Sequence, residues 1–539
     1  MTRRSTPAPK PVVLIAEALS PATLKVLGRD VVVRHVDGTD RAALLTALHE
    51  ADAVLVRSAT QIDAEALAAA PSLRVVARAG VGLDNVDIKA ATRAGVMVVN
   101  APTSNIISAA ELTIGHILSL ARRIPAAHAS LSSGQWKRSA FTGTELFEKT
   151  LGIIGLGRIG GLISARMQAF GMKVVAYDPY ITTTRAQQLG VEILSLNELL
   201  ARADFITIHM PKTPETTGMI STEQLAIMKP TACVINVARG GLIDEDALYT
   251  ALSTGVIGGA GLDVFSSEPP KEGAVRLLAL PNVVVTPHLG ASTEEAQEKA
   301  GVSVAKSVLL ALNGELVPDA VNVAGGAIDT YVRPGIPLTE KLGQFLCAIA
   351  RSAPITNLDV EVHGELAAFD VSALKLAALK GLFTNIVSGQ VSYVNAPLLA
   401  EQRGINVRLI TSAQSDDYRN VVTLKGSLSD GRLISVSGTL TGPKQIEKLV
   451  GINGYAVELP FETYHVVMVY QDRPGIVAVY GQHFGEARIN IAGMQIARDE
   501  AGGSALSVLT VDSPVPEDLL NAVGKAIAAS AIHQIEITE

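Results

Sequence analysis

The sequence predicts an α/β protein in which helix-covered parallel sheets are followed by smaller mixed α+β domains. Three observations support this class. Short β-branched runs alternate with helical stretches through the N-terminal half of the chain, a pattern typical of parallel sheets. A glycine-rich motif, Gly155 to Gly160, stands between a buried strand and a helix. The last segment, 463–539, has a βαββαβ rhythm.

Length and composition indicate several globular domains. A chain of 539 residues is too long for one compact core. The 48% apolar and 18% charged content excludes a disordered or collagen-like chain. The net charge of -7 gives no reason to expect nucleic acid or an anionic membrane as partner. Cys233 and Cys347 alone cannot build a disulfide framework or a cysteine-based metal site, so no metal is expected.

The same features favour a cytoplasmic location. Low cysteine use suits a reducing compartment. The apolar run Val12–Ala16 is too short for a signal-peptide core. No stretch approaches the roughly 20 apolar residues that cross a membrane.

The first unit is expected to be a parallel sheet that leads into a long helix. Its β-branched runs predict five strands: Val12–Ala16, Val31–His35, Ala53–Arg57, Arg74–Arg78 and Val96–Val99. Apolar residues at helical spacing then predict one helix from Ser108 to about Ser132. This helix would connect the first unit to the second.

The second unit runs from about Thr150 to Pro287. Its strands are apolar throughout, as burial on both faces requires: Leu151–Ile154, Val174–Tyr177, Phe205–Ile208, Cys233–Asn236, Gly259–Leu262 and Val283–Val285. A helix from Thr293 to about Leu312 would return the chain to the first unit. The pair Gly325-Gly326 is then expected to be a linker.

Two further units are expected after that linker. Strand-like pieces such as Asn420–Leu424 and Leu433–Thr439 predict a mixed domain over about 330 to 460. The tail predicts a ferredoxin-like βαββαβ module: Val466–Gln471, helix Pro474–Gly485, Ile489–Ala497, Ser504–Val511, helix Glu517–Ala529 and His533–Thr538.

The motif Gly155-Leu156-Gly157-Arg158-Ile159-Gly160 predicts a Rossmann-type dinucleotide site. Its glycines permit the tight turn, let the backbone approach pyrophosphate, and let the helix pack on the strand. Asp178 follows the next strand, where a carboxylate accepts the ribose hydroxyls of NAD and repels the 2′-phosphate of NADP. Arg185 is a nearby cation that could favour NADP, but it is interpreted as a solvated helix residue. The predicted cofactor is NAD.

Arg239, Glu268 and His288 are the candidate catalytic group, because each follows a predicted strand at the edge where α/β sheets hold ligands. Histidine suits proton transfer near neutral pH. Arginine grips a carboxylate with its planar fork, and a carboxylate orients the histidine ring. Taken one at a time, Arg239 is more simply interpreted as a helix cap, Glu268 as a turn residue and His288 as a core histidine. Because all three follow a dinucleotide motif in the same unit, the catalytic interpretation is favoured for the group.

A phosphorylated substrate needs further cations. Arg57 and Arg78 each end a predicted strand of the first unit, the turn Ala79–Gly82 offers backbone N–H groups, and Asn105 adds a donor. The run Trp136-Lys137-Arg138 is either a solvated basic turn or part of the anion site, and its spacing alone leaves both open.

These segments resemble the D-isomer-specific 2-hydroxyacid dehydrogenases, most closely their long members with two extra C-terminal domains. The resemblance extends from about Val12 to Glu539 and includes Ala79 to Asp87, Asn100 to Asn105 and Val237 to Gly241. It implies that Arg239 binds substrate and that Glu268 supports His288 as the acid–base. It also implies cofactor contacts from Gly155, Gly157, Arg158, Ile159, Gly160, Asp178, Val237, Ala238, Arg239, Asp263, His288, Leu289, Gly290 and Ala291.

The resemblance further implies oxidation of 3-phosphoglycerate, the first step of serine biosynthesis. The implied substrate ligands are Arg57, Ser58, Arg78, Gly80, Val81, Asn105, Trp136, Lys137 and Arg138. The last three would reach a neighbour's substrate phosphate across a dimer interface, which implies a homo-oligomer, either dimer or tetramer. The implied domains are a discontinuous flavodoxin-like substrate-binding domain (11–107 and 293–325), an NAD-binding Rossmann domain (108–292), an allosteric substrate-binding-like domain (326–462) and an ACT domain (463–539).

The tail also suggests a regulatory site. In Tyr470-Gln471-Asp472-Arg473-Pro474-Gly475, Asp472 is expected near a helix N-cap and Pro474 near the first helical turn. A helix start can receive an amino acid's carboxylate while Asp472 holds its ammonium. The resemblance implies that Tyr470, Asp472 and Asn490 bind L-serine as a feedback inhibitor. In the middle domain, Lys444 and Lys448 are candidates for an anion site.

Two other functions share part of this pattern. A glyoxylate, hydroxypyruvate or D-lactate reductase has the same catalytic group and dinucleotide motif, usually without the two extra domains. A non-catalytic NADH-sensing corepressor on this fold also keeps the catalytic group. The ACT-like tail and the cations suited to phosphate argue against both.

Overall fold

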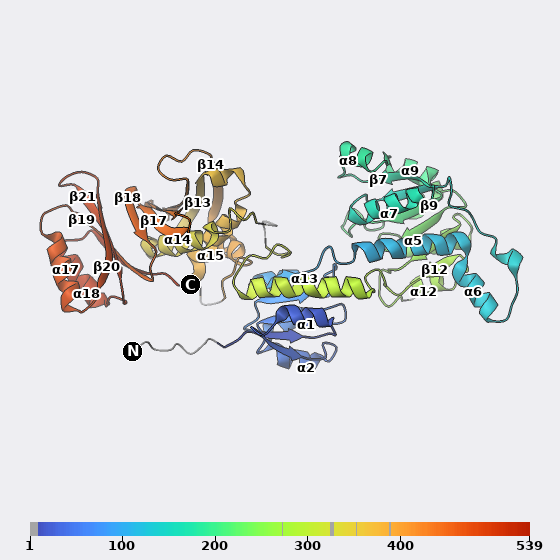
Figure 1. Cartoon of the computed structure of the whole chain (residues 1–539), viewed down its shortest axis with the longest axis horizontal. Helices are drawn as coiled ribbons and strands as arrows, with labels where there is room; N and C mark the ends of the chain where they lie inside the picture. Colours follow the sequence, from blue (N-terminus) through green and yellow to red (C-terminus); the bar gives the residue numbers. More distant parts are fainter. Residues whose placement is uncertain (1–8, 272, 324–327, 352, 388–389, 539) are drawn as a thin grey trace.

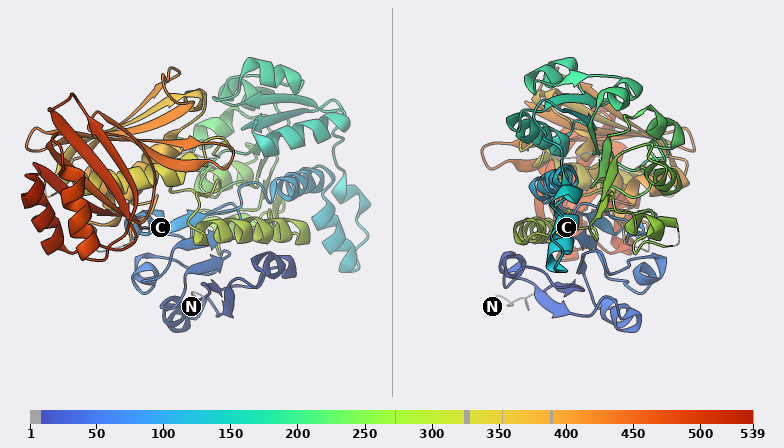
Figure 2. Two further views of the ribbon diagram at one scale, coloured as in Figure 1. Left: turned by 60° about the vertical axis from the view of Figure 1, so that its left-hand side comes forward. Right: turned by 90° about the vertical axis from the view of Figure 1, so that its right-hand side faces the viewer.

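The computed structural model describes residues 9–271, 273–323, 328–351, 353–387 and 390–538. Within these ranges the strands form four separate sheets, two wholly parallel and two mixed or antiparallel. In Figure 1 the seven-stranded sheet and the C-terminal sheet lie at opposite ends of the molecule, and the left view of Figure 2 shows the same separation. The expected linker at Gly325-Gly326 lies outside the described residues.

The first sheet is parallel and five-stranded, with strand order β2-β1-β3-β4-β5. This is the flavodoxin-like order, as predicted. Its strands are β1 (Val12–Ile15), β2 (Val32–His35), β3 (Ala53–Val56), β4 (Val75–Arg78) and β5 (Met97–Val99). Its helices are α1 (Pro21–Leu27), α2 (Arg41–Leu48), α3 (Ala64–Ala68) and α4 (Ile88–Arg93).

Alternate strand residues of this sheet enter two different cores, one on each face. Val13 and Val75 pack with Val304 and Val308 of the returning helix α13 (Glu294–Leu312), which lies along the sheet in Figure 1. Leu14 and its neighbours pack under α2, α3 and α4 on the other face. The chain therefore completes the first unit only after it has built the second.

The second sheet is parallel, with order β12-β11-β10-β9-β6-β7-β8. Read from β6, the chain runs outward to β8, returns to β9 beside β6, and continues outward to β12. This is the doubly wound Rossmann topology. Its strands are β6 (Thr150–Ile154), β7 (Lys173–Tyr177), β8 (Glu192–Ile193), β9 (Phe205–Ile208), β10 (Cys233–Asn236), β11 (Gly259–Leu262) and β12 (Val283–Val285).

The helices of this unit cover both faces of its sheet. They are α5 (Ile106–Arg122), α7 (Arg158–Ala169), α8 (Thr183–Gln188), α9 (Leu196–Arg202), α10 (Thr222–Ile227), α11 (Glu245–Ser253) and α12 (Gly273–Leu278). Residues of α5 and α7, such as Ile117 and Ile163, share one core with Leu151 and Ile153 of β6. Strand β8 was not predicted, because two residues carry no readable periodicity.

The prediction of one continuous helix from Ser108 to Ser132 is wrong. Helix α5 ends at Arg122, and α6 (Ile124–Ser132) starts after Arg123, whose φ of 52° is left-handed. Pro125 lies in the first turn of α6, where its missing N–H costs nothing. The break turns α6 away from the sheet, and none of its residues is buried.

The third and fourth sheets share a core. The third has the order β14-β13-β15-β16-β17-β18, and the fourth has β20-β21-β19-β22. Their strands are β13 (Ile355–Gly364), β14 (Asn406–Ser412), β15 (Asn420–Leu428), β16 (Leu433–Thr441), β17 (Ile446–Ile452), β18 (Tyr455–Pro460), β19 (Tyr464–Gln471), β20 (Ile491–Arg498), β21 (Ser504–Val511) and β22 (Ala531–Glu536). Their helices are α14 (Gly335–Ala350), α15 (Ser372–Thr384), α16 (Ala396–Gln402), α17 (Ile476–Glu486) and α18 (Glu517–Ile527). The tail is βαββαβ in chain order, as predicted.

Helix α14 connects these two sheets. Leu342 and Leu346 of α14 pack in one cluster with Val467 and Val508 of the fourth sheet. The Gln344 amide also donates to the Thr538 carbonyl at 2.9 Å and accepts from the Thr538 N–H at 2.9 Å. One face of the fourth sheet is therefore buried against α14. Burial of apolar surface is the main favourable contribution to folding, so this contact links the two C-terminal units.

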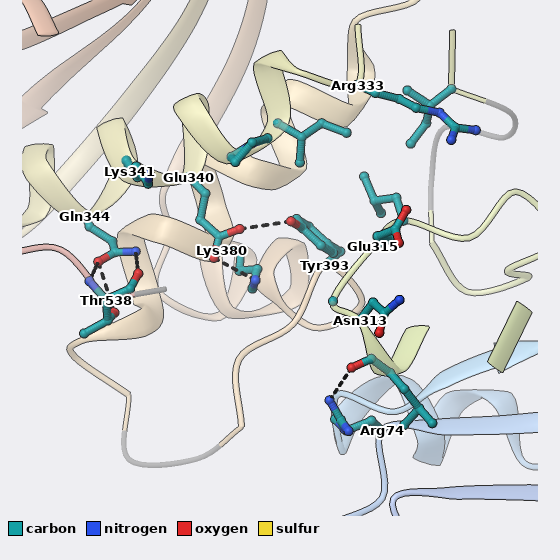
Figure 3. Close-up of a pocket in the computed structure, with 16 residues that line it drawn as sticks. Arg74, Asn313, Glu315, Arg333, Glu340, Lys341, Gln344, Lys380, Tyr393 and Thr538 are labelled. Atoms are coloured by element: carbon teal, nitrogen blue, oxygen red, sulfur yellow. Dashed lines mark hydrogen bonds and ion pairs between the residues drawn. The ribbon is translucent and has the colours of Figure 1, made fainter. Parts of the chain in front are cut away.

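A cavity of about 590 Å³ lies where α14 meets the first unit (Figure 3). On one side Arg74 donates to the Leu312 carbonyl at 2.8 Å. On the other, Glu340 pairs with Lys380 at 2.7 Å and accepts from the Tyr393 hydroxyl at 2.9 Å. The third unit therefore contacts the first unit next to α13, where the Ser392 hydroxyl also donates to the Gly95 carbonyl at 2.8 Å. Among the described residues, no helix is both long and apolar enough to cross a membrane.

Candidate active site

The candidate residues gather where the carboxyl ends of the two parallel sheets meet. Arg57 follows β3 and Arg78 ends β4, while Arg239 follows β10. A Cβ added to Gly82, in the turn after β4, would lie 3.1 Å from the Arg239 Nη2 atom. The glycine turn of the first unit thus lies directly against the guanidinium of the second, and this junction between the two units is the candidate ligand cleft.

Glu268 and His288 form a short hydrogen bond. The His288 Nδ1 atom lies 2.6 Å from the Glu268 Oε2 atom, and the side chains are 47% and 37% exposed. The other carboxylate oxygen of Glu268 accepts from the Phe265 N–H at 3.2 Å. Because Glu268 engages Nδ1, the ring's Nε2 atom remains for proton exchange with a ligand. A cavity of about 400 Å³ adjoins this pair.

The loop that carries His288 is held by a buried carboxylate. Asp263 is 1% exposed and accepts from the Thr286 hydroxyl at 2.5 Å, the Leu289 N–H at 2.7 Å and the Gly290 N–H at 2.9 Å. His288 itself has a left-handed φ of 55°, a conformation that costs free energy in a non-glycine residue. The three hydrogen bonds that Asp263 accepts offset that cost. All three come from Thr286, Leu289 and Gly290 around His288, so Asp263 fixes the conformation of this loop.

Sequence analysis missed His116, which supports Asp263 from α5. Thr286 donates its only hydroxyl hydrogen to Asp263, so His116 Nε2, 2.9 Å from the Thr286 oxygen, must be the donor in that bond. His116 Nδ1 is buried without a hydrogen-bond partner, and burial lowers the pKa of His116. Its position on a helix with core residues gave no sequence signal of this role.

The Arg239 turn is shaped by Asn236, another residue that sequence analysis missed. The Asn236 amide accepts from the Ala238 N–H at 3.0 Å and donates to the Arg239 carbonyl at 2.9 Å. A Cβ at Gly240 would overlap the Phe265 carbonyl oxygen. Glycine is therefore required for the Arg239 turn to contact the loop that carries Glu268.

Three arginines lie close enough to interact. Burial and the charge of Arg239 lower the pKa of Arg78, with Arg57 adding to the effect and Asp84 and Glu17 opposing it. The Arg78 Nε atom is buried without a hydrogen-bond partner. An anion bound here would supply the missing acceptor and relieve the repulsion between cations.

The glycine motif fits a dinucleotide. Gly155 has a φ of 96°, which glycine adopts without strain. A Cβ at Gly160 would overlap the Gly155 carbonyl oxygen, so the third glycine allows α7 to pack against the turn. Around Gly157 nothing lies within 4 Å of an added Cβ. This open surface at the start of α7 is where pyrophosphate would meet backbone N–H groups.

Asp178 is held in place at the end of β7. One carboxylate oxygen accepts from the Leu156 N–H and the other from the Tyr180 N–H, both at 2.8 Å. Since each carboxylate oxygen has a second lone pair, Asp178 keeps acceptors for ribose hydroxyls. The other expected cofactor contacts lie at the same edge: Arg158 and Ile159 in the first turn of α7, Val237 and Ala238 after β10, and Leu289 to Ala291 after His288.

The remaining expected substrate ligands are distributed differently. Ser58 is exposed next to Arg57, and Gly80 lies under the Arg78 guanidinium. The Val81 carbonyl accepts from the Asn100 amide at 2.6 Å, and Asn105 precedes α5 without capping it. Trp136, 78% exposed, Lys137 and Arg138 lie beyond α6. Among the described residues, no hydrogen bond or ion pair joins this run to the arginines of the cleft.

The expected effector residues belong to the fourth sheet and its loops. Asp472 accepts from the Gly502 N–H and from Arg498, both at 3.3 Å, and Asn490 donates to Asp512 at 2.9 Å. Tyr470 is 3% exposed, and its hydroxyl lies 2.6 Å from the Ser507 hydroxyl.

The expected N-terminus of the tail's first helix is incorrect. Helix α17 begins at Ile476 behind Gly475, whose φ is 90° and which has no side-chain cap. Because glycine adopts this left-handed turn readily, the helix starts two residues beyond Pro474 and Asp472 does not cap it.

Lys444 lies in the turn between β16 and β17, and Lys448 is paired with Glu458 at 2.6 Å. Among the described residues, no group of three or more histidine, cysteine, aspartate or glutamate side chains converges on a metal position.

Comparison with known proteins covers the whole chain. Residues 114–290 match the model of the D-isomer specific 2-hydroxyacid dehydrogenase NAD binding domain. Residues 331–453 match that of the D-3-phosphoglycerate dehydrogenase intervening domain. D-3-phosphoglycerate dehydrogenase of Mycobacterium tuberculosis is 51% identical over 98% of this chain and 99% of its own. That of Methanocaldococcus jannaschii is 41% identical over 95% and 97%.

Solved structures match more than half of the chain. A glyoxylate reductase from Paecilomyes thermophila has a TM-score of 0.53 at 28% identity and covers 58% of this chain and 98% of its own. D-lactate dehydrogenase from Aquifex aeolicus, complexed with NAD and lactic acid, has a TM-score of 0.50 at 29% identity, with 56% and 96% covered. These structures match a little over half of the chain, whereas the full-length relatives match nearly all of it. The chain therefore belongs to the D-3-phosphoglycerate dehydrogenases, NAD-dependent oxidoreductases of the D-isomer specific 2-hydroxyacid dehydrogenase family.

Proposed function

We propose that this chain oxidises 3-phosphoglycerate to 3-phosphooxypyruvate with NAD, the first step of serine biosynthesis. The observation that carries the substrate choice is the group of Arg57, Arg78 and Arg239 at the cleft, in which the buried Arg78 Nε atom has no hydrogen-bond partner. One carboxylate needs one arginine fork, so a second anionic group on the substrate accounts for the remaining cations.

The chemistry follows from the groups around His288. Arg239 holds the substrate carboxylate, which places the C2 hydroxyl towards His288. His288 Nε2 accepts the hydroxyl proton, and Glu268 at 2.6 Å stabilises the resulting imidazolium through Nδ1. The glycine turn before α7 and Asp178 would hold NAD, which would supply the acceptor for the hydride of C2. The alcohol thus loses a proton and a hydride and becomes a ketone, and Asp263 keeps the His288 loop in register throughout.

A single assay separates this proposal from its rivals. Purified protein is mixed with NAD and 3-phosphoglycerate, and NADH absorbance is followed. We expect turnover, with glyoxylate and hydroxypyruvate reduced poorly in the reverse direction. Turnover of glyoxylate without any of phosphoglycerate would indicate a reductase, and NADH binding without turnover of any hydroxy acid would indicate a sensor protein.

Asp178 is expected to set the cofactor preference. In Asp178→Ala the ribose hydroxyls lose an acceptor and the repulsion of a 2′-phosphate disappears. We predict that the ratio of kcat/KM for NAD to that for NADP falls at least about tenfold, since one hydrogen bond to a charged group is worth about 1.5–3 kcal/mol. Asp204→Ala, which removes a carboxylate at the opposite end of the sheet, should leave this ratio unchanged. An unaltered ratio in Asp178→Ala would move the ribose site elsewhere.

The βαββαβ tail is proposed to be an ACT domain that binds L-serine. Its polar candidates are the half-buried Asp472 and the exposed Asn490, while Tyr470 would contribute from the core side. We predict that L-serine lowers turnover in the wild type and that Asp472→Ala weakens this inhibition without changing uninhibited turnover. Titration of initial rates with L-serine, with D-serine as control, measures it. Insensitivity of the wild type to L-serine would contradict the proposal.

A homo-oligomer is also proposed. Helix α6 buries none of its residues in its own chain, and Ile124 and Leu131 are 52% and 56% exposed. Covering this apolar surface with a second copy would bring Trp136, Lys137 and Arg138 to the neighbour's cleft.

The middle domain is proposed to bind a second, anionic ligand, with Lys444 and Lys448 as candidates. The proposed location is the cytoplasm.

A further inference from the structure

We propose that Glu17 is a positioning residue that aims the Arg57 turn at the phosphate of the substrate. This inference rests on the proposed function, because it concerns the phosphate end of the same cleft. Glu17 lies two residues beyond the end of β1, and β1 is the strand next to β3 in the sheet. It belongs to none of the sequence motifs discussed above.

The Glu17 carboxylate binds the backbone of the turn that carries Arg57. Its Oε1 atom accepts from the Arg57 N–H at 2.8 Å and from the Thr60 N–H at 3.0 Å. Its Oε2 atom accepts from the Ala59 N–H at 3.3 Å. Three of the four N–H groups in this turn therefore point at a single carboxylate. Charge-assisted bonds of this kind are about twice as strong as neutral ones.

Asn85 holds the same turn through its carbonyl groups. It is 7% exposed, and its amide donates to the Arg57 carbonyl at 2.9 Å and to the Thr60 carbonyl at 2.6 Å. Glu17 and Asn85 thus fix both backbone groups of Arg57. The Arg57 side chain therefore projects from a backbone that has almost no conformational freedom. This lowers the entropy cost of binding an anion.

The position of Glu17 in the sheet explains why a carboxylate stands there. In the order β2-β1-β3-β4-β5 the chain changes direction between β1 and β3. Sheets of this kind bind ligands in the crevice outside that switch point, and converging backbone N–H groups attract anions. Here the protein's own carboxylate fills that crevice. The anion of the substrate is therefore directed to the guanidinium groups of Arg57 and Arg78 next to it.

Glu17 also offsets part of the positive charge of the cleft. Its charge raises the pKa of Arg78, against the effects of burial and of Arg239 and Arg57. A fixed negative charge behind the arginines lets three cations stand together before the substrate arrives.

The test is a split between two Michaelis constants. In Glu17→Gln an amide NH₂ would face backbone N–H groups and the negative charge is lost, so the turn loosens. We expect the KM for 3-phosphoglycerate to rise about tenfold, which corresponds to the loss of one charge-assisted hydrogen bond. The KM for NAD should stay within about twofold of the wild-type value. Steady-state rates with each substrate varied in turn measure both constants.

A matched control separates positioning from stability. Asp52 accepts from the Val12 N–H at 2.7 Å in the same unit, at the start of β3 and so at the opposite end of that strand from Arg57. Asp52→Asn should lower the melting temperature and change neither constant. If Glu17→Gln does not fold, Glu17→Asp is read in the same way.

The outcomes are distinct. An unchanged KM for 3-phosphoglycerate, or an equal rise of both constants, would overturn the role of Glu17. Failure of the wild type to oxidise 3-phosphoglycerate would instead overturn the proposed function.

Discussion

Replacement of His288 by alanine is expected to abolish most turnover while NAD binding persists. The change removes the proton acceptor from the cleft and leaves the Glu268 carboxylate without its partner at 2.6 Å. General acid–base groups contribute about 10²- to 10⁴-fold to rate, so kcat for 3-phosphoglycerate oxidation should fall by that range. The dissociation constant of NAD, measured by calorimetry, should change less than about threefold, because the proposed contacts at Gly157 before α7 and at Asp178 after β7 are left intact.

The control for this variant is His49→Ala, which removes an exposed histidine at the end of α2. It should behave as the wild type in both measurements. Loss of NAD binding together with turnover in His288→Ala would mean that His288 maintains the structure of the loop and does not transfer the proton. Glu268→Gln should show a smaller loss, since the amide oxygen still accepts from Nδ1 while the charge is gone.

Replacement of Arg239 by lysine is expected to lower kcat/KM for 3-phosphoglycerate by about 10²-fold, comparable with the loss of one preorganised donor at a reacting centre. Lysine keeps the positive charge but not the two parallel N–H groups that grip a carboxylate. It also gives up the bond from Nη1 to the Ala238 carbonyl at 2.7 Å, which orients the side chain. Both kcat and KM should worsen, because the substrate is held loosely in ground state and transition state.

Arg276→Lys is the matched control, since Arg276 pairs with Asp246 on the surface of the same unit at 2.6 Å. Its kinetic constants should equal those of the wild type. A kcat/KM for Arg239→Lys within about twofold of the wild-type value would show that charge alone is sufficient at this position. The carboxylate would then have to be bound by other groups, such as Arg78.

Features that depend on neighbouring residues could be predicted from the sequence. The three roles of Gly155, Gly157 and Gly160 follow from their spacing between a buried strand and a helix. The structure shows the turn at Gly155 and the close packing at Gly160, and it leaves the space around Gly157 open. Apart from β8, the strands of both parallel sheets were predicted within a residue or two, mostly because burial on both faces leaves a continuous apolar run. The predictions failed where one residue decided the backbone path, at Arg123 between α5 and α6 and at Gly475 before α17.

The supporting contacts of the site were beyond sequence analysis. Glu17 binds a turn that begins 40 residues away, His116 reaches Thr286 across 170 residues, and Asn236 acts through the backbone of Arg239. Each is a single polar residue without periodicity or motif, so only folding shows what it contacts. The sequence by itself determined the types of sheet, the dinucleotide motif and the residues of the chemistry, because these depend on local spacing and residue type. The tertiary structure alone decided which residues hold them in place, because a hydrogen bond between distant segments exists only once both strands have their positions in the sheets.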